Sequence, residues 1–439
     1  MGAAADRELE AIVLATDPVS RERIAGLSAR ERAIRVAKRV GASKVTVVDD
    51  PAQLETLTPA SALLVIRADQ LVHTPLVQPL VDRELPHDGV AIAVVPENPA
   101  VTDLTVGSYA GAFIATGAMA KAAVHALAGG DDTFVASVAE PLRVPHGAIA
   151  RAPIRTAEER RTAQRVLYRI LIKPQDNAIT RYLYRPVSFP LTRLLVWTPI
   201  TPNQISYLVA ALVAVGCWFT AHRSMTMALV GTVIVLVASY VDCCDGEVAR
   251  VKLLSSRFGA WIDTIVDELS TIGYMVAIGW HCHLYFGPRY FGDLPIDPWT
   301  TAIAVSCVTL VWCVYCIYYN IIVAVGSANS QDYVGRFEVV PGTQPNSVKL
   351  APAAAKAIAT KEPLPQPLEW LATYAPYLVR RDFISWIAVL LVALHWTHIT
   401  FAAFVAGGLV SFVILTIDHI KLRSLRRSVV RRGMLLEAP

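Results

Sequence analysis

Hydrophobic residues are unevenly distributed along the 439-residue chain. Charged residues interrupt the apolar ones throughout residues 1–198, whereas long uncharged stretches dominate from Leu194 onward. A helix of about 20 apolar residues is long enough to cross a bilayer. The pattern therefore predicts a water-soluble N-terminal unit followed by a membrane unit. The composition agrees, since 54% of the residues are hydrophobic and only 17% are charged.

The N-terminal unit alternates apolar runs with segments of helical spacing. Four runs rich in Val, Ile and Leu predict buried strands at residues 11–15, 44–49, 62–68 and 90–96. Residues 28–40 and 76–84 have the spacing of amphipathic helices. This alternation predicts an α/β domain with a largely parallel sheet. No cleavable secretory signal is expected, because the first thirty residues contain no continuous apolar core.

The remainder of the chain contains six apolar segments of spanning length, which predict an α-helical membrane domain with six transmembrane helices. They are residues 203–221, 224–241, 258–285, 298–326, 376–396 and 400–421. The last two are separated only by His395-Trp396-Thr397-His398, so we expect a tight hairpin there.

A basic segment joins the two units. Residues 155–193 carry arginines at helical spacing with Tyr182, Leu183, Phe189 and Leu195 between them. Such a segment suits an amphipathic helix on an anionic membrane surface, and an ordinary linker helix is the alternative. The predicted domains are the α/β domain (1–155), the juxtamembrane segment (156–198), the six-helix domain (199–421) and a basic tail (422–439).

The distribution of basic residues predicts the orientation in the membrane. The loop at residues 250–257, the loop before the fifth segment and the tail are all basic, whereas the opposite loops hold only Arg223 and Arg289. We therefore expect a multi-pass protein of the cell (inner) membrane. Its N-terminal domain, active site and C-terminus would be cytoplasmic.

Four aspartates stand where two of these segments meet. Asp242 and Asp245 end the second segment at i and i+3, and Asp263 and Asp267 begin the third at i and i+4. Each pair therefore lies on one face of its helix. Only eight residues separate Arg250 from Gly259, so the two helices are expected to be antiparallel neighbours. The four carboxylates would then converge in one cleft. Ionisable residues within membrane helices are rare and usually have a functional role, so these aspartates are candidate site residues.

Four close carboxylates repel one another and cannot all stay ionised without cations. Hard oxygen ligands suit Mg²⁺, Mn²⁺ or Ca²⁺, and sharing among four carboxylates suggests two ions. Two metals suit displacement at phosphorus. Small residues at Gly246, Ala249 and Gly259 leave room for a ligand near the backbone. A buried charge network in a transporter is the alternative interpretation of the aspartates alone.

The arrangement of these residues resembles a family motif. It reads Asp242-x-x-Asp245-Gly246-x-x-Ala249-Arg250, eight residues, Gly259-x-x-x-Asp263-x-x-x-Asp267. This is similar at every fixed position to the motif of the CDP-alcohol phosphotransferases, a family with a six-helix membrane fold. The resemblance implies attack by an alcohol on the β-phosphorus of a CDP-alcohol, with release of CMP.

The resemblance also implies roles for individual residues. The four aspartates would bind two divalent cations, Mg²⁺ or Mn²⁺, and Asp267 would be the base that deprotonates the acceptor hydroxyl. The CDP site would comprise Pro202, Asn203, Asp242, Gly246, Ala249, Arg250 and Gly259. Arg380 and Arg381 could hold a phosphorylated acceptor. The alternative is that they only reflect the enrichment of basic residues in cytoplasmic loops of membrane proteins. The implied partners are a CDP-alcohol, a lipid or inositol phosphate acceptor, anionic membrane lipids and a second copy of the chain, with no nucleic acid.

The domain order resembles the bifunctional inositol-1-phosphate cytidylyltransferase/di-myo-inositol-phosphate-phosphate synthases. The connector residues 173–177, Arg181, Arg185-Pro186 and Ser188 carry much of this likeness. The first domain departs from it. Residues 14–20 lack the glycine-rich loop that would hold CTP phosphates. Asp69 stands where such enzymes place a metal-binding aspartate, but Ala152 and Pro153 replace expected acidic residues.

We therefore expect a cytidylyltransferase-like domain without catalysis, the alternative being an unrelated α/β domain. For the whole chain, the other classes are a membrane transporter and a non-catalytic scaffold, each with a regulatory soluble domain. The complete motif favours the enzyme. The donor stays open between a CDP-inositol and a CDP-lipid, within phospholipid or phosphoinositol biosynthesis.

Overall fold

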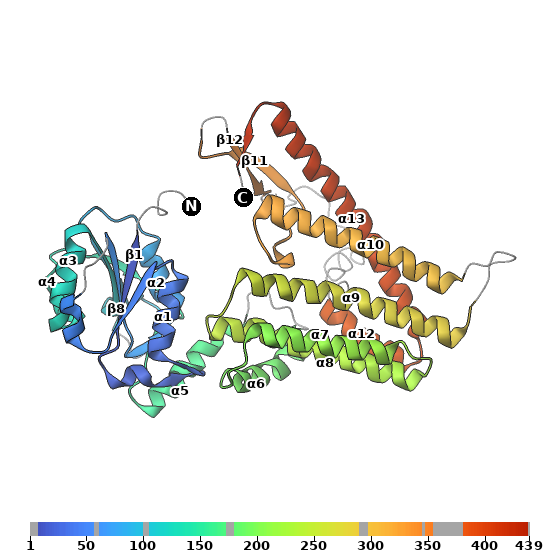
Figure 1. Cartoon of the computed structure of the whole chain (residues 1–439), viewed down its shortest axis with the longest axis horizontal. Helices are drawn as coiled ribbons and strands as arrows, with labels where there is room; N and C mark the ends of the chain where they lie inside the picture. Colours follow the sequence, from blue (N-terminus) through green and yellow to red (C-terminus); the bar gives the residue numbers. More distant parts are fainter. Residues whose placement is uncertain are drawn as a thin grey trace. The chain divides into compact units, whose positions relative to one another are not determined.

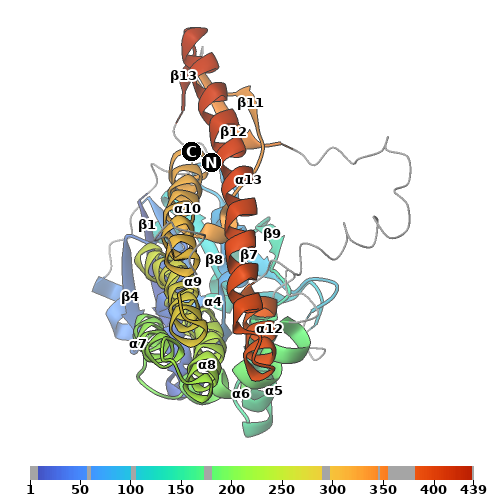
Figure 2. The same cartoon turned by 90° about the vertical axis from the view of Figure 1, so that its right-hand side faces the viewer.

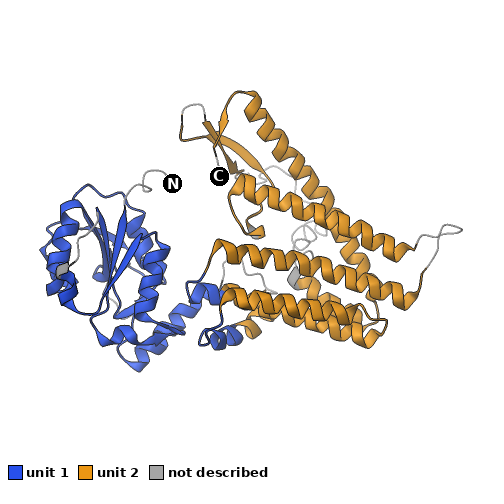
Figure 3. Cartoon of the chain, viewed as in Figure 1, with its two compact units in different colours: residues 1–176, 189–200, 247–254 blue, residues 177–188, 201–246, 255–439 orange. Residues whose placement is uncertain are grey.

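The computed structural model describes residues 8–56, 61–99, 105–172, 180–288, 297–344, 347–353 and 381–437. The chain divides into two compact units (Figure 3). The first comprises residues 1–176, 189–200 and 247–254, and the second comprises residues 177–188, 201–246 and 255–439. Residues 1–155 lie in the first unit and most of residues 199–421 in the second, while the segment expected to join them is divided between the two.

A six-stranded sheet forms the centre of the first unit, in the order β4-β1-β5-β8-β7-β9. The strands are β1 (Leu9–Leu14), β4 (Lys44–Val48), β5 (Ala62–Arg67), β7 (Val90–Val94), β8 (Tyr109–Thr116) and β9 (Leu142–Pro145). The four predicted strands are present, and three of them are mostly buried as expected, whereas the edge strand β4 is only partly buried. The sheet is nevertheless mixed, because β8 runs antiparallel to both β5 and β7. The other three pairings are parallel.

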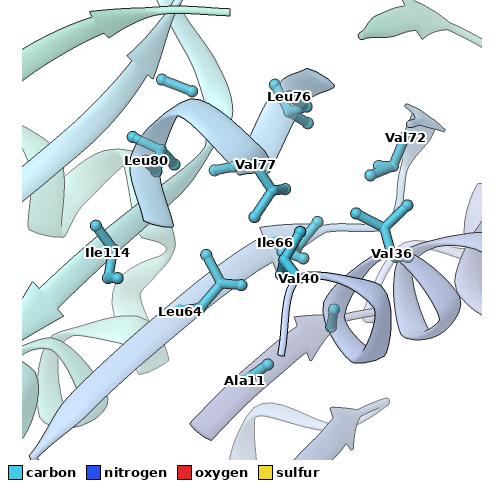
Figure 4. Close-up of a cluster of buried hydrophobic side chains, with 14 of the residues drawn as sticks. Ala11, Val36, Val40, Leu64, Ile66, Val72, Leu76, Val77, Leu80 and Ile114 are labelled. Carbon is cyan, nitrogen blue, oxygen red and sulfur yellow. The ribbon is translucent and has the colours of Figure 1, made fainter. Parts of the chain in front are cut away.

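Helices cover both faces of this sheet (Figure 1). The predicted helices α1 (Ala29–Arg39) and α2 (Thr74–Val81) pack on one face, and α3 (Gly117–Ala126) and α4 (Asp131–Ser137) on the other. Figure 4 shows Val36 of α1 and Leu76 and Leu80 of α2 beside Leu64 and Ile66 of β5. Burial of each such side chain contributes about 1.5–3 kcal/mol.

Shorter elements complete the two units. They are β2 (Arg23–Ile24), β3 (Leu27–Ser28), β6 (Gln70–Val72), β10 (Arg151–Pro153), α5 (Ala157–Tyr168), α6 (Arg185–Leu195), β11 (Phe337–Pro341), β12 (Ser347–Pro352) and β13 (Leu435–Leu436). β10 pairs with β6, and β12 lies between β11 and β13.

The basic connector is not one continuous helix. A capping box between Thr156 and Glu159 starts α5, which ends at Tyr168, and α6 begins at Arg185 after the π-helical turn Thr180–Tyr184. The connector residues 173–177 lie outside the described residues. α6 retains the amphipathic character expected of the segment, since Val187 and Leu194 are exposed while Ser188 and Thr192 are buried.

The second unit is a bundle of long helices (Figures 1 and 2). They are α7 (Pro202–Thr220), most of α8 (Met225–Val251), α9 (Arg257–Phe286), α10 (Pro298–Asn320, followed by the π-helical turn Ile321–Val325), α12 (Arg381–Ala393) and α13 (Thr397–Arg431). His395 turns the chain between α12 and α13 with a φ of 63°, which confirms the tight hairpin.

Four described helices are long and apolar enough to cross a membrane. They are Pro202–Thr220, Met225–Val251, Pro298–Val325 and Thr397–Arg431. α9 has 30 residues, but polar residues along it lower its hydropathy, and the described part of the fifth segment is the 13-residue α12. By the length and composition of these helices, the chain is a helical membrane protein as expected. Four of the six predicted spans are long and apolar enough to cross a membrane.

Close packing joins the helices that carry the aspartates. Val209 and Val213 of α7, Ala238 of α8 and Val266 of α9 form one apolar cluster. α7 and α8 cross closely, because a Cβ added to Gly231 would lie 2.4 Å from the carbonyl oxygen of Gly216. Only glycine permits that approach.

Candidate active site

Three of the predicted aspartates lie together. Carboxylate oxygens of Asp242 and Asp245 on α8 and of Asp263 on α9 all lie within 4.8 Å of one another. The i, i+3 spacing on α8 places two of these groups on one helix face, and the antiparallel course of α9 supplies the third. Asp267 lies one turn further along α9 and is not part of this close group.

The carboxylate of Asp245 is fixed by its surroundings. Its side chain is buried, and the hydroxyl of Ser206 on α7 donates a hydrogen bond of 2.7 Å to its Oδ2. The backbone N–H of Gly246 donates to its Oδ1. Ser206 is not among the residues predicted for the site. Its position three residues after Asn203 on the same helix face was a signal that could have identified it.

Two residues predicted for the nucleotide site lie side by side. A Cβ added to Gly259, near the start of α9, would lie 3.0 Å from Oδ1 of Asn203, near the start of α7. Glycine therefore allows the asparagine to approach the α9 backbone. Ser256 caps α9 by accepting a hydrogen bond of 2.9 Å from the N–H of Gly259, which fixes where that helix begins.

The remaining predicted residues are placed by their helices. Pro202 is the first residue of α7, and Gly246, Ala249 and Arg250 lie in the last two turns of α8. Among the proposed acceptor residues, Arg380 lies outside the described residues, and Arg381 is the first residue of α12.

A cavity of about 210 Å³ opens beside Asp242. Along α8 its lining extends from Asp242 to Thr232, ten residues that correspond to about 15 Å of helix. Most of its lining is apolar, with a few hydroxyl groups. The lining residues are Val209, Val213, Thr232, Val235, Leu236, Ser239, Asp242, Ser270, Thr271, Tyr274, Ile384, Ser385, Ala388 and Phe404.

The three clustered aspartates suit a divalent cation. They offer only hard oxygen donors, which Mg²⁺ and Mn²⁺ prefer. Carboxylates this close repel one another in a poorly solvated site, and a bound cation would relieve that repulsion. The donor set therefore fits the metal chemistry inferred from the sequence.

The segment that carries these residues has recognisable relatives. Residues 199–360 match the model of the CDP-alcohol phosphatidyltransferase family. The match covers less than half of the 439-residue chain and includes the whole aspartate motif.

Several curated proteins are similar to parts of the chain. It is 32% identical over 127 residues to a "Bifunctional IPC transferase and DIPP synthase" of Aquifex aeolicus, covering 29% of this chain and 28% of that protein. A protein of the same name from Rubrobacter xylanophilus is 34% identical over 123 residues, with 27% and 28% covered. The chain is also 32% identical over 89 residues to a "CDP-diacylglycerol--inositol 3-phosphatidyltransferase" of Drosophila melanogaster, covering 20% and 36%. The matched part thus spans about a quarter to a third of each relative.

The first unit holds a second group of charged residues, at the carboxyl ends of β1 and β5. Arg155 donates to Asp17 at 2.7 Å and to Asp69 at 3.2 Å, and Arg67 pairs with Asp69 at 2.6 Å. Burial opposes ionisation of Asp69, but the hydrogen bond and positive charge of Arg67, with the charge of Arg155, lower the pKa of that carboxyl. Asp17 and Asp69 are therefore both paired with guanidinium groups, and Arg67 also pairs with Asp132 at 2.9 Å.

Proposed function

We propose that the chain catalyses transfer of a phosphoalcohol group from a CDP-alcohol to an acceptor hydroxyl, with release of CMP. The observation that carries this proposal is the convergence of Asp242, Asp245 and Asp263 within the segment that matches the family. A complete motif favours an enzyme over a transporter or a scaffold with a regulatory soluble domain.

The four aspartates would hold two divalent cations, Mg²⁺ or Mn²⁺, which supply neutralisation of the pyrophosphate charge when bound. Ser206 holds Asp245 in a fixed orientation, so that its carboxylate need not reorganise. Asp267 accepts the proton of the acceptor hydroxyl. The acceptor oxygen forms a bond to the β-phosphorus as the bond from that phosphorus to the CMP oxygen breaks. Asn203, Gly246, Ala249, Arg250 and Gly259 line the CDP position, with Pro202.

The cavity beside Asp242 favours a CDP-lipid as donor. The cavity is apolar and extends about 15 Å along α8. A hydrocarbon chain would bind there favourably because burial removes its apolar surface from water, whereas the polar CDP-inositol has no apolar chain to place in it. The relatives' names include both a phosphatidyltransferase and inositol phosphate enzymes. We propose an inositol phosphate or related alcohol as acceptor, held by Arg380 and Arg381, in phospholipid or phosphoinositol biosynthesis.

We propose that α9 and the fifth segment also cross the membrane, which makes six spans in the cell (inner) membrane. α9 has 30 residues, which is long enough to span, and two of its charged residues, Asp263 and Asp267, belong to the proposed site. The N-terminal domain, the site and the C-terminus would be cytoplasmic. Anionic lipids would contact the basic segment, and the assembly would be a homodimer.

The α/β domain (1–155) is proposed to be cytidylyltransferase-like and without catalysis. The ion pairs of Arg155 with Asp17 and Asp69 support this, because a guanidinium takes the place of a cation between those carboxylates. The other domain bounds are those expected from the sequence (156–198, 199–421 and 422–439).

The test uses purified full-length protein in vesicles, supplied with CDP-lipids, CDP-inositol and acceptors in the presence of Mg²⁺ or Mn²⁺. We expect CMP release, and Asp267→Asn should reduce it by at least about 10²-fold, the typical contribution of a general base. Glu338→Gln, which removes an exposed carboxylate of β11, serves as the control. Full activity of the Asp267 variant would exclude it as the base. Absence of CMP release from every donor would refute the proposed reaction.

A further inference from the structure

The C-terminal end of α8 belongs structurally to the α/β domain. Residues 247–254 are part of the first unit, although Asp242 and Asp245 of the same helix are part of the second. Leu253 is nearly buried in the apolar cluster that α1 and α2 form on the sheet. Its φ of 55° is unusual for a leucine, so the turn after α8 is held by its surroundings.

Two arginines of α1 bind this end of α8. Arg32 is completely buried, and its Nη1 donates to the carbonyl oxygen of Val251 at 2.8 Å, while its Nη2 donates to that of Ile24 at 3.1 Å. Arg35 donates through Nη1 to the carbonyl oxygen of Lys252 at 2.7 Å. The last carbonyls of a helix lack intrahelical partners and carry partial negative charge, so these cations stabilise the helix end.

The same turn also fixes the residues that precede α7. Lys252 is buried, and its Nζ donates to the carbonyl oxygens of Thr198 at 2.6 Å and Ile200 at 3.0 Å. α7 begins two residues after Ile200, at Pro202, and carries Asn203 and Ser206. The turn after α8 therefore contacts both α1 and the segment that leads into α7.

These contacts involve an unusual burial of positive charge. Both hydrogen-bond acceptors of Arg32 are backbone carbonyls, and burial lowers the pKa of its guanidinium to about 10. Burial also lowers the pKa of the Lys252 ammonium, with the charge of Arg35 adding to the effect. A buried cation costs free energy unless its donors are satisfied. Here both terminal nitrogens of Arg32 donate to backbone carbonyls, while its Nε has no partner among the described residues. The Lys252 ammonium donates to two carbonyls of the segment before α7.

We propose that the α/β domain positions the metal-binding aspartates through this clamp, which we define as Arg32 and Arg35 with the carbonyls of Val251 and Lys252. Val251 lies six residues after Asp245, or about 9 Å along a rigid helix. Loss of the clamp would let the end of α8 fray and would loosen the geometry of Asp242 and Asp245. The clamp gives a domain without catalysis a role in the transferase site, and thus rests on the proposed function.

Arg35 offers the cleaner test, because it is only half-buried and its loss leaves the core of the domain intact. Arg35→Met removes the hydrogen bond to the Lys252 carbonyl together with the ion pair to Glu31, and Arg35→Lys retains a positively charged donor. Arg39→Met, in the exposed last turn of α1, is the matched control. Mn²⁺ binding to each full-length protein in vesicles is measured by electron paramagnetic resonance, together with CMP release.

We expect Arg35→Met to weaken Mn²⁺ binding and to lower kcat at saturating Mn²⁺, each by about 10-fold, since ångström-scale misplacement costs up to about 10²-fold. Arg35→Lys should recover most of both losses, and Arg39→Met should match the unmodified protein. A change confined to kcat and metal affinity, with an unchanged KM for the CDP-alcohol, separates positioning from general destabilisation.

Unchanged Mn²⁺ affinity in Arg35→Met would overturn the clamp, as would equal losses in Arg35→Lys and Arg35→Met or failure of the unmodified protein to bind Mn²⁺. The binding measurement does not depend on turnover. If Mn²⁺ binds with the expected differences but no CDP-alcohol is consumed, the proposed reaction fails and the clamp stands.

Discussion

Replacement of Ser206 by alanine removes a single contact to the aspartate cluster. The hydroxyl donates to Oδ2 of Asp245 at 2.7 Å, and Asp245 is buried beside Asp242 and Asp263. A hydrogen bond to a charged group contributes about 1.5–3 kcal/mol. Because each 1.4 kcal/mol corresponds to a factor of ten, Ser206→Ala should weaken divalent-cation binding by about 10- to 100-fold. Loss of groups that orient metal ligands has effects of about this size.

The assay is titration of CMP release with Mn²⁺ in vesicles, with Mn²⁺ binding measured in parallel. We expect the apparent Mn²⁺ requirement to rise while the rate at saturating Mn²⁺ falls less. Ser306→Ala removes a comparably buried hydroxyl from α10 and serves as the control. If Ser206→Ala and Ser306→Ala respond to Mn²⁺ alike, the orientation of Asp245 does not depend on Ser206 and the reasoning is refuted.

Two further predictions concern the cavity and the α/β domain. Ala388→Trp projects a large side chain into the cavity beside Asp242. Because changes in the size of a hydrophobic pocket alter substrate selectivity by about 10-fold or more, the rate of CMP release with CDP-lipid, relative to the rate with CDP-inositol, should fall about 10-fold. Equal losses for both donors would contradict a lipid-binding cavity. The Arg67 and Arg155 pairs lower the pKa of Asp69, so its stabilising contribution is present above the unfolded pKa of about 3.9 and is lost as pH falls through the folded value. Asp69→Asn should therefore lower the melting temperature of the full chain by about 3 °C or more at pH 7, with the difference shrinking in acid; a difference independent of pH would argue against the ion pairs.

The local patterns of the chain predicted much of the fold. The apolar runs at residues 44–49 and 62–68 correspond to β4 and β5. A run of consecutive aliphatic residues suits a strand buried on both faces, as β5 is, whereas β4 at the edge of the sheet is only partly buried. β8 is almost wholly buried, but the sequence pattern does not predict it, since its glycine and three alanines give a weak strand signal. Its antiparallel pairing depends on strands distant in sequence.

The aspartate site was predictable for the same local reason. The spacing of Asp242 and Asp245 places both on one helical face, and the short connection to Asp263 requires α9 to return beside α8. That reasoning uses only the helical period and the length of a loop. It does not reach Ser206, whose relation to Asp245 spans 39 positions along the chain.

The amino-acid sequence by itself determined the two-part organisation, the long apolar helices and the aspartate motif, because these follow from periodicity and spacing within short segments. The tertiary structure decided which distant groups meet. Arg32 reaches the carbonyl of Val251 across 219 positions, and Arg155 reaches Asp17 across 138. Whether a charged side chain is buried, and which groups accept its hydrogen bonds, depends on residues that are distant in the sequence. A local sequence pattern does not contain this information. The structure therefore decided that Asp17 and Asp69 are paired with arginines and that two arginines of α1 donate hydrogen bonds to the end of α8.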